Sequence, residues 1–152
     1  MDTIPLLPDF RDLLKFFSDE GVRYLIVGGM AVNRYGYHRS TGDLDVWVAV
    51  DEENERRIAK ALRRFGFSES TVSRRPLLEM GKFIRIGEKP FRVEILTVAS
   101  GVEFDECYQR REVTRIDDLE INFISLGDLR SNKRAANRAK DQADLENLPD
   151  PG

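Results

Sequence analysis

Hydrophobic residues along the chain follow two periods, one typical of amphipathic helices and one typical of strands. Apolar residues three and four positions apart predict a helix over residues 9–20, which ends before Gly21. A second helix is predicted between Asp51, which can cap its start, and Gly66, which can close it. Further helices are predicted over residues 30–37, 103–110 and 133–148, and one more begins at Ser125, which forms a capping box with Asp128.

Short apolar runs rich in β-branched and aromatic residues predict the strands, which occupy residues 24–27, 44–50, 82–86, 91–97, 112–116 and 119–124. Two pairs of these runs look like hairpins, one joined by residues 87–90 and one by Asp117-Asp118. Residues 68–80 have no clear pattern and are expected to include a loop around Pro76. The mixture of hairpins and helices predicts an α/β (α+β) fold, in which helices pack on a mixed β-sheet.

The length of 152 residues suits one domain, and no repeat or linker divides the chain. We expect a core over about residues 20–125 and a C-terminal helical segment over about residues 125–148. A net charge of −3 gives no general attraction to nucleic acid or to anionic membranes. The single cysteine, Cys107, excludes an internal disulfide and a thiolate metal site. No apolar run approaches the ~18 residues of a membrane span, and no signal-peptide pattern is present, so a cytoplasmic location is predicted.

Three acids fall inside or beside apolar strands. Asp43 and Asp45 are two positions apart, so on a strand their side chains point to the same face, about 7 Å apart. Glu94 lies inside a later apolar strand. A carboxylate in such a setting is costly unless it is paired or binds a cation, and carboxylates suit Mg2+ or Mn2+. The alternatives are a chance Asp-x-Asp pattern and, for Glu94, a paired core acid.

Gly28-Gly29 ends the first strand and leads into a predicted helix. Such a junction lets backbone N–H groups approach phosphate oxygens. Together with carboxylates that hold a metal, it favours a nucleoside triphosphate as ligand, whereas a pair of glycines alone is more often simply a turn.

These residues resemble the signature of the DNA polymerase beta-type nucleotidyltransferase superfamily. The matching pattern is Val27-Gly28-Gly29, then 13 residues, then Asp43-Leu44-Asp45-Val46, with Val93-Glu94-Ile95 at the third acidic position. Glutamate at that position departs from the more usual aspartate. A closer likeness is to small prokaryotic nucleotidyltransferase-like proteins, including the toxins of abortive-infection toxin–antitoxin systems, through residues 28–32, 39–45 and 132–145.

The resemblance implies a mixed β-sheet core and the transfer of a nucleoside monophosphate from a triphosphate, such as ATP, to an acceptor hydroxyl with Mg2+. By the same resemblance Asp43, Asp45 and Glu94 would hold the metal, and Gly28 and Gly29 would border the triphosphate. Arg39 and Thr41 would lie near it. Lys133 and Asp141 would act from the C-terminal helices.

Chemistry leaves several roles open for the two C-terminal residues. Lys133 can neutralise phosphate charge, and Asp141 can orient Lys133, contact ribose or act as a base, but both can also belong to a solvated helix face. Three functions therefore remain open. The protein could be an enzyme whose acceptor is a protein, an RNA or a small molecule. It could instead be a protein-interaction partner in a toxin–antitoxin pair, or a nucleotide sensor without turnover. A partner protein or a second copy of the chain would be one way to complete the acceptor site.

Overall fold

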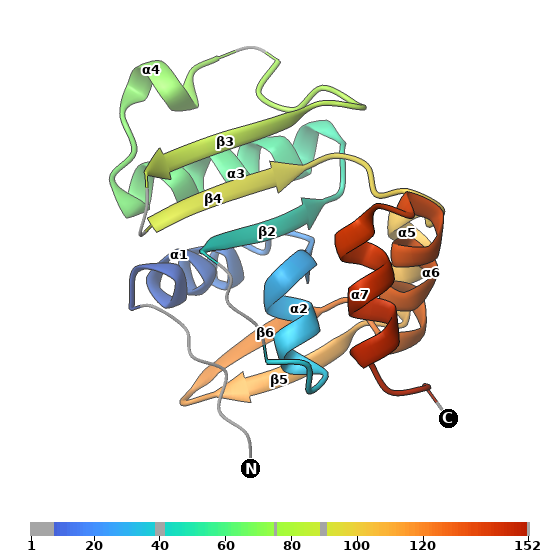
Figure 1. Cartoon of the computed structure of the whole chain (residues 1–152). Coiled ribbons are helices and arrows are strands. Elements are labelled where there is room, and N and C mark those ends of the chain that lie inside the picture. The colour runs from blue at the N-terminus through green and yellow to red at the C-terminus, as the bar shows by residue number, and fades with distance from the viewer. Residues whose placement is uncertain (1–7, 39–41, 75, 89–90, 152) are drawn as a thin grey trace.

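The computed structural model describes residues 8–38, 42–74, 76–88 and 91–151. These residues form a six-stranded sheet in the order β3-β4-β2-β1-β6-β5 (Figure 1). The strands are β1 Tyr24–Val27, β2 Asp43–Val48, β3 Phe83–Glu88, β4 Phe91–Leu96, β5 Glu112–Ile116 and β6 Leu119–Phe123. Strand β2 pairs parallel with β4, and β1 with β6, while the β1–β2, β3–β4 and β5–β6 pairs are antiparallel. The predicted α+β fold with a mixed sheet is therefore confirmed.

The helices are α1 Pro8–Asp19, α2 Gly28–Arg34, α3 Glu52–Phe65, α4 Glu69–Val72, α5 Phe104–Gln109, α6 Leu126–Ala136 and α7 Ala139–Asn147. In Figure 1, α1 and α3 lie together behind the sheet and α2 lies in front of it, whereas α7 packs against α6 at the right-hand end of the strands. No helix in the described part of the chain is long and apolar enough to cross a membrane.

The two faces of strands β2 and β4 differ in chemistry. Leu44 of β2 lies beside Val93 of β4, and both side chains are fully buried. Phe91, two residues before Val93 on the same face, contacts Phe10 of α1 and stacks on Phe65 of α3. This face is therefore the core beneath α1 and α3. Because side chains alternate along a strand, the acids of β2 and β4 emerge on the opposite face.

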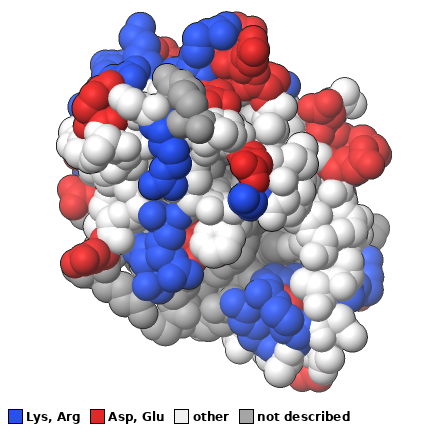
Figure 2. Space-filling view, turned by 90° about the horizontal axis from the view of Figure 1, so that it is seen from above, with Lys and Arg blue, Asp and Glu red and all other residues white. Residues whose placement is uncertain are grey.

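Strand β3 forms one edge of the sheet and exposes part of its apolar surface, since Phe83 is 55% exposed. Figure 2 looks down on this side of the molecule and shows a band of Lys and Arg side chains with Asp and Glu at its edges. Charged residues on an edge strand limit its pairing with other chains.

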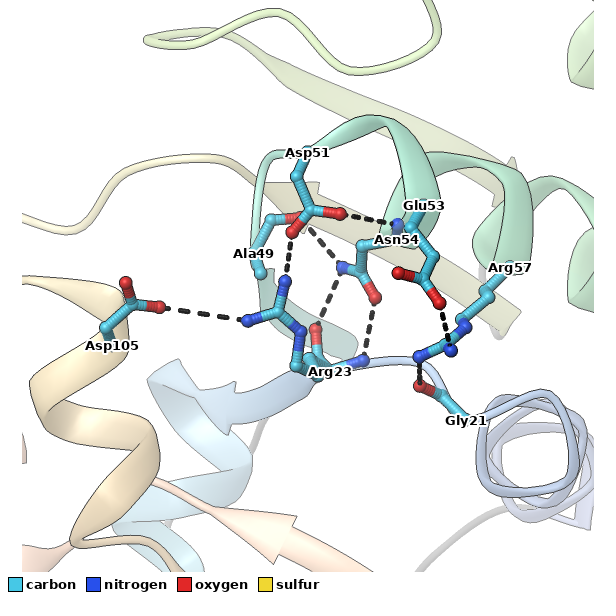
Figure 3. Close-up of polar contacts among 8 residues, drawn as sticks. All are labelled: Gly21, Arg23, Ala49, Asp51, Glu53, Asn54, Arg57 and Asp105. Carbon is cyan, nitrogen blue, oxygen red and sulfur yellow. Dashed lines mark hydrogen bonds and ion pairs between the residues drawn. The ribbon is translucent and has the colours of Figure 1, made fainter.

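A buried side chain fixes the start of α3 to the sheet (Figure 3). Asn54 accepts a hydrogen bond from the Arg23 N–H at 2.8 Å and donates to the carbonyls of Arg23 and Ala49 at 3.1 and 2.7 Å. Asp51 accepts from the Asn54 N–H at 2.8 Å, which confirms the predicted cap. These bonds join the beginning of β1 to the end of β2, and so hold the two strands that carry the candidate site at their other ends.

The described residues from Pro76 to Met80 form the expected loop, and the same segment also contains the short helix α4, whose Val72 is fully buried and which the local pattern did not predict. Two local expectations were wrong. Helix α2 begins at Gly28 rather than at residue 30. The segment 133–148 is two helices, since Asn137 adopts a left-handed conformation with φ of 51° and Arg138 is extended.

Candidate functional site

Strand register brings the three predicted acids to one face of the sheet. Asp45 of β2 lies directly beside Glu94 of β4, and Asp43 lies beside Arg92. Asp45 is also the antiparallel neighbour of Val27, the last residue of β1. The acids and the glycine turn after Val27 therefore meet at one place, although they are far apart in the sequence.

Gly28 is required where it stands. Its φ of +66° is one that L side chains rarely adopt, and a Cβ added to it would lie 2.2 Å from Oδ2 of Asp45. The absent side chain thus makes the space that the carboxylate of Asp45 occupies. This close approach links the glycine turn and the acids into a single site.

The acids repel one another. Burial, followed by the charges of Glu94 and Asp43, raises the pKa of Asp45 to about 6, while Lys140 and Lys133 act in the opposite direction. A carboxylate held in this way would bind a cation favourably, because the cation relieves both the repulsion and the desolvation.

Two of the acids already have cationic partners. Arg92 donates two hydrogen bonds to Asp43, both at 3.0 Å, and Arg85 donates to Oε1 of Glu94 at 2.7 and 3.0 Å. Among the described residues, no group of three or more His, Cys, Asp or Glu side chains is arranged to hold a metal ion. Binding a cation at all three acids would therefore require the two arginines to release Asp43 and Glu94.

The opposite wall comes from the junction of α6 and α7. Lys133 is only 3% exposed, and its Nζ lies 3.2 Å from Oδ1 of Asp141 and 3.0 Å from Oδ2 of Asp144. Arg138 also holds Asp141, through its backbone N–H at 3.0 Å and through Nε at 2.7 Å. Burial raises the pKa of Asp141, but the hydrogen bonds from Arg138 and Lys133 outweigh it and bring that pKa to about 2. The solvated helix face considered for Lys133 and Asp141 is thus wrong.

A cleft of about 580 Å³ separates the acids from this wall. Six of the residues proposed from the sequence line it, namely Gly28, Gly29, Asp43, Asp45, Glu94 and Lys133. Asp141 is fully buried and meets the cleft only through Lys133 and Arg138. Arg39 and Thr41, also proposed from the sequence, lie outside the described residues.

Sequence reasoning missed Arg138 and Lys140, which also line the cleft. Both fall within the C-terminal motif, but matching a family pattern assigned roles only to Lys133 and Asp141. It also missed Arg85 and Arg92, because the β3–β4 and β2–β4 registers that set them beside Glu94 and Asp43 do not follow from local patterns.

Comparisons with known proteins support the fold. No protein-family profile matches the sequence, and no curated protein matches it. A crystal structure from Thermotoga maritima, described as a "putative nucleotidyltransferase", superimposes with a TM-score of 0.63 over 90% of this chain and 87% of that chain, at 15% sequence identity. At this identity the likeness shows a nucleotidyltransferase-like fold, while the activity must be argued from the site.

Proposed function

We propose that this chain is a Mg2+- or Mn2+-dependent nucleotidyltransferase that moves a nucleoside monophosphate from a triphosphate, such as ATP, to an acceptor hydroxyl and releases pyrophosphate and the hydroxyl proton. The observation that carries the proposal is the cleft itself, in which carboxylates face lysine and arginine across a space of about 580 Å³. That volume lies within the usual range for small-molecule sites. A metal–triphosphate complex needs acidic ligands at one end and cationic partners for its phosphates at the other.

Each wall of the cleft has a distinct part in the reaction. Asp45 would hold the divalent cation together with Asp43 and Glu94 once the arginine partners of those two acids move aside. The bound cation would neutralise phosphate charge and make the attacking hydroxyl more acidic. Gly28 leaves Asp45 room to face the cleft, and positive charge on the opposite wall would orient the phosphates.

The acceptor is a protein, an RNA or a small molecule. The sequence likeness to abortive-infection toxins supports a place in a toxin–antitoxin pair, with a partner protein or a second copy completing the acceptor site. The band of Lys and Arg side chains on the β3 side is compatible with an RNA acceptor (Figure 2).

The test is a transfer assay with triphosphates labelled at the α-phosphate, in Mg2+ or Mn2+, with tRNA, co-encoded proteins and small hydroxyl compounds as acceptors. We expect label on one acceptor and a loss of at least 100-fold with Asp45→Asn. Asp12→Asn, an exposed acid on α1, is the matched control and should retain full activity. Transfer that survives in Asp45→Asn would refute the proposed role of the acids.

The arginine pairs favour a second function, nucleotide binding or protein interaction without turnover. Arg92 and Arg85 neutralise Asp43 and Glu94 where catalysis would need these acids for a metal. In that case the wild type would bind nucleotide but transfer nothing to any acceptor. Arg92→Gln would then strengthen Mn2+ binding, measured by titration calorimetry, because it removes the guanidinium that pairs with Asp43.

A further inference from the structure

The charged residues that line the cleft differ in whether a protein partner already neutralises them. Asp43 and Glu94 are paired with Arg92 and Arg85. Asp45 has no ion pair with a described residue, and this leaves it as the acid whose charge faces the cleft uncompensated. The opposite wall carries three cations, which are Lys133, Arg138 and Lys140.

Lys133 is already neutralised by ion pairs within the protein. Its ammonium group lies within 3.2 Å of both Asp141 and Asp144, which are 0% and 1% exposed. To reach a ligand, Lys133 would have to leave two buried carboxylates, and separating a buried charge from its partner is strongly unfavourable. Lys133 therefore holds α7 against α6.

The guanidinium of Arg138 is partly occupied within the protein, because its Nε and Nη2 both donate hydrogen bonds to Asp141. Lys133 and Arg138 together carry as much positive charge as Asp141 and Asp144 carry negative charge. The four residues form a neutral cluster, and this cluster contributes little net attraction for a polyphosphate.

Lys140 is different. Its side chain is exposed, it lines the cleft, and within the described part of the chain it forms no ion pair. It lines the same cleft as Asp45. Lys140 is thus the cation whose charge remains available to a ligand.

We propose that Lys140, rather than Lys133, binds the polyphosphate of the nucleotide, and that Lys133 is a positioning residue that fixes the α6–α7 junction. This inference rests on the proposed function for the identity of the ligand. In the bound state the divalent cation lies at Asp45 and the phosphates extend from it toward Lys140. An ammonium group serves here as a point charge for phosphate oxygens.

The test measures binding of inorganic tripolyphosphate and of MgATP by titration calorimetry. Lys140→Gln should weaken both ligands by about 10- to 100-fold, which is the usual effect of losing one charge-assisted contact. Lys140→Arg should retain most of the binding. Lys15→Gln removes an exposed lysine of α1, outside the cleft, and should leave binding unchanged. Thermal unfolding should be the same for Lys140→Gln and the wild type.

Two results would overturn the inference. One is wild-type affinity in Lys140→Gln. The other is loss of binding in a folded Lys133→Met protein while Lys140→Gln still binds. Failure of the proposed function looks different, because the wild type would then bind MgATP through Lys140 but transfer no label. A wild type that binds neither tripolyphosphate nor MgATP would refute both.

Discussion

Replacing Lys133 by Met tests whether this lysine stabilises the fold. Methionine keeps the length and the apolar part of the side chain but removes the ammonium group that lies between Asp141 and Asp144. Asp141 keeps its bonds from Arg138, whereas Asp144 loses its ion pair with Lys133. The substitution therefore leaves buried negative charge that the rest of the cluster no longer balances.

The expected loss of stability follows from the burial of these groups. Removing one partner of a buried ion pair typically costs about 3–5 kcal/mol. We expect about 3 kcal/mol, at the lower end, because Arg138 still binds Asp141. For a domain of this size each kcal/mol lowers Tm by about 2–4 °C, so the expected fall is roughly 6–12 °C.

The assay is thermal and urea unfolding followed by circular dichroism, with Lys133→Met/Asp144→Leu as the matched control. The double variant should recover at least half of the lost stability, because it removes the carboxylate of Asp144 together with the ammonium group of Lys133. A fall in Tm below 2 °C for the single variant, or a double variant no better than the single one, would refute the reasoning.

Acid unfolding gives a second measure of how much this cluster of Lys133, Arg138, Asp141 and Asp144 stabilises the fold. The pKa of Asp141 is lowered from 3.8 to about 2, so this carboxylate stabilises the fold above pH 4, and that contribution disappears as the pH falls from about 4 to 2. The shift corresponds to about 2 kcal/mol. Lys133→Met removes one of the hydrogen bonds that lower the pKa of Asp141. The stability of this variant should therefore depend less on pH between about 4 and 2 than that of the wild type.

Three further substitutions test the residues around the site. Asp45→Asn should abolish transfer but stabilise the fold by about 1–2 kcal/mol at pH 8 in urea unfolding. The reason is that burial, then Glu94 and Asp43, raise the pKa of Asp45 to about 6, so the penalty of its charge is present above pH 6 and should vanish near pH 4. Gly28→Ala should cost about 2–4 kcal/mol and abolish transfer, because the new Cβ meets Asp45 at 2.2 Å and the backbone is left-handed; wild-type activity and Tm would contradict this. Asn54→Ala should cost about 2–4 kcal/mol in urea unfolding through lost buried hydrogen bonds, and a loss below 1 kcal/mol would contradict it.

Much of the sheet could be predicted from the sequence because its strands are short apolar runs bounded by turn residues. The run at 24–27 matches β1, and the runs at 112–116 and 119–124 match β5 and β6 to within one residue. The order of the strands could not be predicted this way. The parallel register that sets Asp45 beside Glu94 depends on which strands pack under α1 and α3, and no local pattern encodes that choice.

The C-terminal wall shows why a motif can locate a site without assigning its roles. Lys133, Asp141 and Asp144 meet because the chain turns at Asn137, whose left-handed backbone folds α7 back against α6. Asparagine tolerates that conformation better than most residues, but it is also acceptable inside a helix, so the sequence alone favoured one continuous helix. On one helix Lys133 would lie more than two turns from Asp144 and would be free to meet a ligand. The turn buries Lys133 instead. The cation that remains available to a ligand is Lys140, which directly precedes Asp141, the other residue to which the motif had assigned a role.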